Sequence, residues 1–367
     1  MEARPMRESF MRHAVWSRHN GVAVVGATGM VGRCLLALLH KRGVPAASVR
    51  AFASARSAGT TVAFGPDQLP VQEVKPGAFV GVRFAFFAVN AAVARSLCPQ
   101  AVREGAVCLD KSSAHRLLPD VPLVVPQINA ERLAGYRARG IVASPNCVAI
   151  PVTRVLAVLR QGAPLQRVVA CTYQAASGAG DAGVRRLQQA LCDFAATPSI
   201  DMDVAGGGPR GSSQTKGDAV PLPGIPEGEP FLPHGRSEEE EKVVRECRRV
   251  LEAPELPMEA TCVRVPVFHG HAVALHAAFD GPLSVERARG LLAEAEGVKL
   301  VDEGRLGPYP TSVDVTGTDM VAVGRVRRDR SVAHGLALWV CSDNVCVGAA
   351  LNAVRTAEIL YERYWER

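Results

Sequence analysis

Aromatic residues are scarce in this chain, at 5% of its 367 positions, and long apolar runs are missing although apolar residues make up 48%. No stretch approaches the roughly 18 apolar residues that cross a bilayer, so we expect no membrane span. Residues 1–20 are basic and lack the apolar segment of a secretory signal, and we expect a poorly ordered extension there. The length and composition are those of a globular protein with two domains.

The ten cysteines form no C-x-x-C pair and no Cys/His group with zinc spacing. We therefore expect no metal site, and we expect reduced thiols in the cytoplasm. The formal net charge is only +6, and basic residues are spread along the chain without interleaved aromatics. Nucleic-acid binding is not indicated, and anionic small molecules are the expected partners.

The apolar runs indicate two kinds of sheet. In the first third, strands are predicted at 22–25, 49–53, 84–89, 106–109 and 121–125, with helices at 30–42 and 92–104. This alternation predicts an α/β fold with a Rossmann-type doubly wound parallel sheet. Later strands at 168–173, 261–268 and 272–279 predict a second, α+β domain on a largely antiparallel sheet. Residues 201–235 are predicted as a long loop or lid, and 347–364 as a helix that packs back onto the first domain.

The glycine spacing G-x-x-G-x-x-G follows the first strand and opens the first helix. Gly26 permits a tight turn, Gly29 lets the backbone approach a pyrophosphate, and Gly32 allows close packing of helix and strand. The segment predicted to bind a dinucleotide is Gly26-Ala27-Thr28-Gly29-Met30-Val31-Gly32.

Acidic residues are absent between Glu8 and Asp67, where an NAD site usually places one for the ribose 2′-hydroxyl. The second strand instead leads to Arg56, flanked by the hydroxyls of Ser54 and Ser57. A guanidinium with hydroxyl neighbours can hold a 2′-phosphate, so we expect NADP as the cofactor.

Pro145-Asn146-Cys147 stands directly before an apolar run with helical spacing. A cysteine at the start of a helix lies near unpaired N–H groups and the positive end of the helix dipole, and both favour the thiolate. A nucleophilic cysteine next to a nicotinamide predicts oxidation or reduction of a carbonyl through a thioester.

Four further segments carry polar residues suited to a site. In chain order, the first segment follows a strand end and the second combines a strand with a loop of small residues. The third begins a helix with a capping box of Ser237 and Glu240, and the fourth ends in two histidines. The four segments are Asp110–Arg116, Thr172–Gly180, Ser237–Lys242 and Arg264–His271. Glu239 and Lys242 are expected on one helix face.

Together these motifs resemble aspartate-β-semialdehyde dehydrogenases over residues 21–360. The matching segments read G-A-T-G-x-V-G, A-S-x-R-S-A-G, S-S-A-x-R, P-N-C, T-Y-Q-A-x-S-G-A-G, C-V-R-V-P-V-x-x-G-H and D-N followed by G-A-A-L-N-A. The resemblance implies reduction of L-aspartyl-4-phosphate to the semialdehyde and inorganic phosphate, on the route to lysine, methionine, threonine and isoleucine. It also implies a homodimer, an NADP-binding domain at 21–146 plus 344–367, and a catalytic and dimerisation domain at 147–343.

The resemblance also implies a role for each site residue. Cys147 is the expected nucleophile, His271 the acid–base residue and Gln174 the residue that orients the substrate. The expected substrate contacts are Arg264 for the α-carboxylate, Glu239 for the amino group, Arg116 and Lys242 for phosphate, and Asn146, Ser177 and Gly178 around them. Asn344 is an expected further contact to the nucleotide.

The chain departs from the family pattern at four places. Lys111 replaces the usual asparagine, Val148 and Ala149 replace small hydroxyl residues, and Cys346 and Val347 replace a basic pair. Residues 219–226 lack the family's asparagine in a segment expected near the subunit interface. Two alternatives stay open: an N-acetyl-γ-glutamyl-phosphate reductase, whose cysteine usually follows glycine, and a catalytically degenerate paralogue with a binding or regulatory role.

Overall fold

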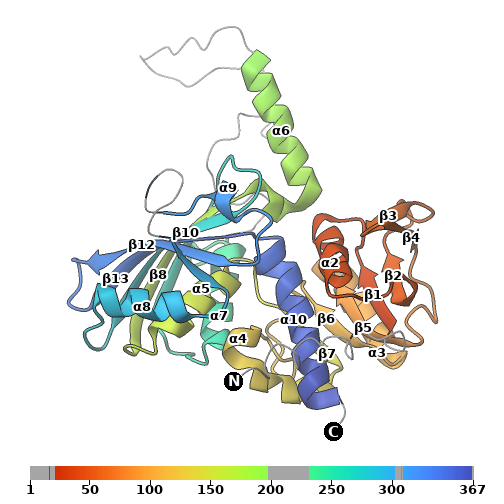
Figure 1. Cartoon of the computed structure of the whole chain (residues 1–367), viewed down its shortest axis with the longest axis horizontal. Helices are drawn as coiled ribbons and strands as arrows, with labels where there is room; N and C mark the ends of the chain where they lie inside the picture. The colour runs from red at the N-terminus through yellow and green to blue at the C-terminus, as the bar shows by residue number, and fades with distance from the viewer. Residues whose placement is uncertain (1–15, 17–20, 197–230, 302–306, 308, 366–367) are drawn as a thin grey trace, which may run out of the picture.

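The computed structural model describes residue 16 and residues 21–196, 231–301, 307 and 309–365. Two β-sheets lie side by side, and the C-terminal helix α10 (Leu351–Leu360) runs between them (Figure 1). Helix α6 (Gly180–Ala196) projects away from both. The expectations for residues 1–20 and 201–235 fall almost entirely outside the described residues, although Trp16 is buried against Phe84 with ring centroids 6.1 Å apart.

The first sheet has seven strands in the order β3-β4-β2-β1-β5-β6-β7, and every pairing except β3 with β4 is parallel. Its strands are β1 (Gly21–Val25), β2 (Val49–Phe52), β3 (Thr61–Phe64), β4 (Asp67–Gln72), β5 (Val82–Phe87), β6 (Val107–Asp110) and β7 (Ile141–Ala143). The helices among them are α2 (Met30–Lys41), α3 (Ala91–Arg103) and α4 (Pro126–Asn129). The prediction of a doubly wound parallel sheet is confirmed.

The second sheet has six strands in the order β11-β12-β13-β10-β8-β9. The three inner pairings are antiparallel, and the outer pairings, β11 with β12 and β8 with β9, are parallel. Its strands are β8 (Leu165–Gln174), β9 (Met258–Arg264), β10 (His271–Phe279), β11 (Val298–Val301), β12 (Val321–Asp329) and β13 (Gly335–Ser342). The largely antiparallel second domain is thereby confirmed.

One face of the second sheet is covered by helices. They are α5 (Ala149–Leu159), α7 (Glu238–Val250) and α8 (Val285–Glu294), while the short α9 (Ser312–Val315) lies near β13. Val155, Val244 and Leu292 from the three helices share one apolar core with Val168 and Leu275 of the sheet. This packing fixes the start of α5 against the ends of β8 and β10.

The C-terminal segment belongs to the first sheet's core, as predicted. A π-helical turn, Cys346–Ala350, leads into α10, and α10 packs on the core that contains β1 and α2. Arg42 at the end of α2 pairs with Glu358 at 2.7 Å. This return of the chain brings Asn344 and the π-helical turn to the junction of the two sheets.

Two predicted strands are wrong in part, and proline explains both. Residues 121–125 make only one isolated bridge, Leu123 to Ala143, because Pro122 has no N–H to donate to a ladder. Strand β9 ends at Arg264 rather than at 268, since Pro266 interrupts it. His269 and His271 are therefore not neighbours on one strand. No helix in the described ranges is long and apolar enough to cross a membrane.

Candidate active site

Cys147 lies at the junction of the two sheets, in the turn between β7 and α5. Asn146 holds this turn: its side-chain oxygen accepts the Val148 N–H at 2.7 Å, and its carbonyl accepts the Ile150 N–H at 3.1 Å. Gly348 of the π-helical turn packs against the other side, where a Cβ would lie 2.9 Å from the Cβ of Cys147. The thiol is thus fixed from both sides and remains half-buried.

His271 faces Cys147 with its Nε2 3.4 Å from the sulfur. The backbone N–H of Ala175 donates to the other ring nitrogen, Nδ1, at 3.0 Å. Because Nδ1 accepts, the neutral ring carries its proton on Nε2 and presents an N–H to the sulfur. His269 is half-buried outside this contact, so the structure separates the two histidines that the sequence left adjacent.

Burial favours the uncharged forms of both groups. It lowers the pKa of His271 to about 3, with further lowering by the charges of Arg264 and Lys111. It also raises the pKa of Cys147, Glu239 adds to the rise, and Lys111, Arg116 and Arg264 oppose it. Desolvation thus acts against the helix start, which favours the thiolate, and on balance the pKa of Cys147 is raised.

The hydrogen bond from Ala175 favours the acid part of the acid–base role expected for His271. A base needs a lone pair directed at the thiol, whereas this tautomer directs a proton at it. In this arrangement His271 is suited to stabilise a thiolate or to protonate an oxygen formed next to the sulfur.

Glu239 joins three elements of the site. Its Oε1 accepts from Asn146 Nδ2 at 2.9 Å and from Gln174 Nε2 at 3.3 Å. The capping box of Ser237 and Glu240 starts α7, as predicted, in the same turn that contains Glu239, and it orients Glu239 toward β8. Gln174 is 2% exposed, so its amide is held in place rather than mobile in solvent.

Arg264 and Gly178 lie on the same side of the site. Arg264 donates from Nη1 to the carbonyl of Ala175 at 2.6 Å. Gly178 is exposed, and a Cβ there would come within 2.6 Å of the same Nη1. A small residue at 178 therefore leaves the guanidinium accessible to a ligand.

Asn344 connects the small-residue loop to the segment before His271. Its side-chain oxygen accepts from Ser177 Oγ at 3.0 Å and from the N–H of Gly270 at 3.1 Å. Asn344 is 4% exposed. It lies next to the π-helical turn, which packs against α2. Through these hydrogen bonds, Asn344 holds the loop that contains Ser177 close to α2, the helix that follows the glycine-rich turn.

Arg116 and Lys242 both have carboxylate partners. Arg116 donates to the buried Glu246 at 3.0 Å and to the carbonyl of Lys111 at 2.6 Å, and its Nε is buried without a partner among the described residues. Glu246 also accepts the backbone N–H of Asn146 at 2.5 Å. Lys242 pairs with Glu238 at 3.6 Å.

The glycine-rich turn fits a dinucleotide. Gly26 has a φ of +88°, and a Cβ at Gly26 or Gly32 would collide with backbone carbonyls. Gly29 caps α2 without a side-chain hydrogen bond, so the first N–H groups of the helix are open to a phosphate. Residues 27, 28, 30 and 31 complete this turn. Ser54, Arg56 and Ser57 lie in the turn after β2, where Ser54 and Arg56 are exposed and Ser57 is half-buried. Arg56 has no hydrogen bond or ion pair with any described residue.

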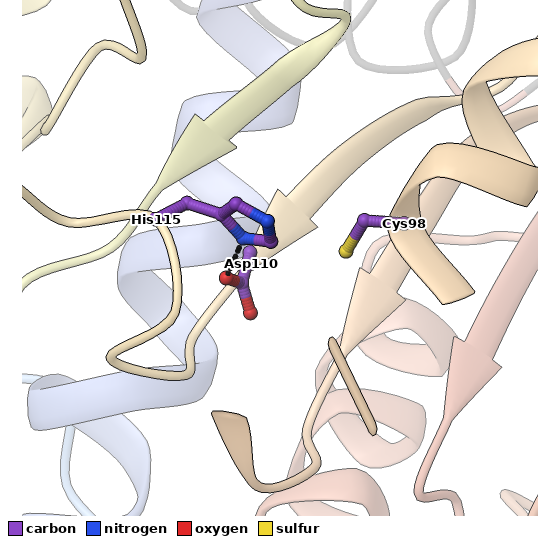
Figure 2. A group of neighbouring side chains, drawn as sticks. All are labelled: Cys98, Asp110 and His115. Atoms are coloured by element: carbon purple, nitrogen blue, oxygen red, sulfur yellow. Dashed lines mark hydrogen bonds and ion pairs between the residues drawn. The ribbon is translucent and has the colours of Figure 1, made fainter. Parts of the chain in front are cut away.

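Asp110 organises the loop that carries Arg116 and is the centre of a buried group with Cys98 and His115. His115 Nδ1 lies 2.6 Å from Asp110 Oδ2. Figure 2 shows this pair, with the Cys98 sulfur apart from it. One sulfur, nitrogen or oxygen atom from each of the three side chains lies within 4.8 Å of the others, which is the spacing of possible metal ligands. Both Asp110 oxygens already accept hydrogen bonds from Ser112. We interpret the group as a fastening of the 110–116 loop.

Two residues of the site were missed in the sequence. Glu246 lies seven residues after Glu239, which is two turns of the helix. This spacing places both side chains on one face of α7 and is the signal from which Glu246 could have been predicted. Gly348 belongs to the G-A-A-L-N-A segment, but nothing local shows that it contacts Cys147. Its position depends on the return of the chain from the second sheet.

Comparisons with known proteins agree with this architecture. Residues 21–136 match the family model "Semialdehyde dehydrogenase, NAD binding domain", and residues 156–347 match "Semialdehyde dehydrogenase, dimerisation domain". The aspartate-semialdehyde dehydrogenase of Synechocystis sp. is 40% identical over 94% of this chain and 98% of its own. That of Bacillus subtilis is 38% identical over 92% and 96%.

Solved structures give the same result. Aspartate semialdehyde dehydrogenase II from Vibrio cholerae, complexed with ASA, has a TM-score of 0.85 at 35% identity and covers 95% of this chain and 100% of its own. A probable aspartate-semialdehyde dehydrogenase from Pseudomonas aeruginosa has a TM-score of 0.82 at 31% identity, over 94% and 99%. The chain therefore belongs to the aspartate-semialdehyde dehydrogenase family.

Proposed function

We propose that this protein is an NADP-dependent aspartate-semialdehyde dehydrogenase that reduces L-aspartyl-4-phosphate through a thioester on Cys147. The observation that carries the proposal is the Cys147–His271 contact of 3.4 Å, in which His271 is oriented by the Ala175 N–H. An acyl group on this sulfur would lie between a proton donor and the held amides of Asn146 and Gln174.

The steps follow from the groups in the site. Cys147 first loses its thiol proton to solvent, and the thiolate then attacks the acyl carbon of the substrate. A C–S bond forms, and phosphate leaves with the electron pair of the broken C–O bond. Bound NADPH supplies the hydride that reduces the thioester. The oxygen formed next to the sulfur then re-forms a carbonyl, and the C–S bond breaks. His271 Nε2–H stabilises the thiolate that departs, and it can protonate the same oxygen in the reverse direction.

Two charged residues suit the invariant end of an amino-acid substrate. Arg264 offers a planar guanidinium beside exposed Gly178, which matches an α-carboxylate. Glu239 offers a carboxylate to an α-ammonium group. Arg116, through its unpartnered Nε, and Lys242 supply donors for the leaving phosphate.

For the cofactor, we propose NADP because Arg56, Ser54 and Ser57 stand where an acidic residue would select NAD. Gly26 to Gly32 would hold the pyrophosphate at the start of α2. We place the cofactor with residues 21–146 and 344–367, and the substrate and the dimer contact with 147–343. All ten cysteines are unpaired, which supports a cytoplasmic location.

A homodimer is proposed from the second sheet's face opposite α5, α7 and α8. Val169 and Cys171 of β8 are half-buried there, and Tyr173 is 40% exposed against Trp339, with ring centroids 5.4 Å apart. Apolar and aromatic groups on an open sheet face are typical of a subunit interface. Cys171→Arg should convert a dimer into a monomer in analytical ultracentrifugation. A wild-type chain that sediments as a monomer would contradict the dimer.

The test of the activity is phosphate-dependent reduction of NADP with L-aspartate-4-semialdehyde. We expect turnover that disappears without phosphate and falls at least about 1000-fold in Cys147→Ser, because a hydroxyl is a far weaker nucleophile. Turnover with N-acetyl-glutamate semialdehyde instead would indicate the reductase alternative. Folded wild-type protein without turnover on either substrate would indicate the degenerate paralogue.

A further inference from the structure

The charges around the proposed phosphate position do not add up to a cationic site without another residue. The Arg116 charge is already balanced by Glu246, whose side chain is only 1% exposed. Lys242 is likewise paired with Glu238, at 3.6 Å. A phosphate that carries between one and two negative charges would therefore meet hydrogen-bond donors there but little net positive charge.

Lys111 supplies the missing charge. It follows β6 at the carboxyl edge of the first sheet, and its carbonyl accepts the Arg116 Nη2–H at 2.6 Å, so the two residues are held together. Its side chain is half-buried, and in the part of the chain that the structure describes its ammonium has no hydrogen bond or ion pair. Lys111 is thus the cation of this cluster whose charge no carboxylate contact neutralises.

The charged groups that influence Lys111 belong to the candidate active site. Burial lowers its pKa, the nearby Arg116 lowers it further, and Cys147, Glu239 and Asp110 oppose this. An anion bound next to Lys111 would favour its charged form. The path from Lys111 to the nucleophile is short: Arg116 contacts Glu246, and Glu246 accepts the Asn146 N–H next to Cys147.

We propose that the Lys111 ammonium is a direct ligand of the phosphate group, contributing the net charge that the Arg116–Glu246 pair lacks. The proposal rests on the proposed function, since it takes the acyl phosphate as substrate and inorganic phosphate as product. It gives Lys111 a specific role at a position where the family usually has an asparagine, which can donate a hydrogen bond but carries no charge.

The first measurement needs no turnover. Inorganic phosphate should protect Cys147 from alkylation by iodoacetamide, and the phosphate concentration for half-protection is the readout. In Lys111→Met and Lys111→Asn it should rise at least about tenfold, as expected for the loss of one charge-assisted hydrogen bond. Lys111→Arg, which keeps the charge, should stay within about threefold. Lys299→Met, on the exposed side of β11, is the matched control and should leave it unchanged.

The second measurement is the KM for inorganic phosphate in the semialdehyde assay. It should rise at least about tenfold in Lys111→Asn, while the KM for the semialdehyde changes less than about twofold. A residue that only supports the fold would change both values. Circular dichroism of the three Lys111 variants identifies any that misfold. If the methionine variant misfolds, the arginine and asparagine variants still test the proposal.

The outcomes separate the two proposals. Turnover with a phosphate KM that Lys111→Asn does not change would overturn the role of Lys111 and leave the proposed function. Protection by phosphate that depends on Lys111, without turnover in the wild type, would overturn the proposed function and leave the anion site. Half-protection that is equal in all variants, or no protection in the wild type, would overturn the role of Lys111.

Discussion

Gly348 packs directly on Cys147, although 200 residues separate them: a Cβ at position 348 would lie 2.9 Å from both the Cβ and the carbonyl oxygen of the cysteine. The π-helical turn that contains Gly348 is the first part of the chain to return to the first sheet from β13. The nucleophile is therefore positioned by its own turn and also by the C-terminal segment.

Gly348→Ala is expected to displace Cys147 and to lower kcat by about 10- to 100-fold, because a shift of about 1 Å at a reacting group can cost this much. Activity and thermal unfolding should be measured together. The matched control is Gly290→Ala in α8, where a Cβ meets nothing within 4 Å. That change should stabilise the fold by about 0.5–1 kcal/mol and leave kcat unchanged. Full activity in Gly348→Ala would show that the π-helical turn can move without displacing Cys147, and it would contradict the positioning role of Gly348.

The ionisation of Cys147 should depend on Glu239. Since burial and Glu239 raise the pKa of the thiol, the thiol form dominates at neutral pH, and alkylation by iodoacetamide should become steadily faster as the pH rises through 9. Glu239→Gln removes a negative charge and should move this pH dependence to lower pH. Glu238→Gln, on the same helix turn with a side chain 44% exposed, should not. Equal profiles for all three proteins would exclude the influence of Glu239.

Arg56→Ala is expected to reduce the preference for NADP over NAD at least about tenfold, because a guanidinium–phosphate contact is lost while the pyrophosphate turn stays intact. Ratios of kcat/KM for the two cofactors are the measurement. Arg103→Ala at the end of α3 is the control, since the end of that helix lies at the opposite edge of the parallel sheet from the cofactor. If the ratio is unchanged in Arg56→Ala, the cofactor assignment to Arg56 is wrong.

Arg264→Lys should raise the KM for the semialdehyde at least about tenfold while the melting temperature stays close to that of the wild type. A lysine ammonium keeps the charge but cannot form the parallel pair of hydrogen bonds that a carboxylate accepts from a guanidinium. The contact of Arg264 with the Ala175 carbonyl is partly exposed, so little stability depends on it. A normal KM in this variant would remove Arg264 from substrate binding.

Several parts of the site are local, and the sequence determined them. The turn of Gly26, Gly29 and Gly32 needs only a strand before it and a helix after it, and the capping box of Ser237 and Glu240 spans three residues. The place of Cys147 before α5 follows likewise from Asn146 and the apolar run behind it. Local hydrogen bonds and steric limits act within a few residues, so the sequence expresses them directly.

Tertiary structure decided the rest. It separated His271 from His269, paired Arg116 with Glu246 across 130 positions, and set Gly348 against Cys147. It also favours the neutral forms of the thiol and the imidazole, because desolvation depends on which distant segments cover a group. The sequence thus contained the chemical groups of the site, and the contacts between its two sheets determined their charge states and their partners.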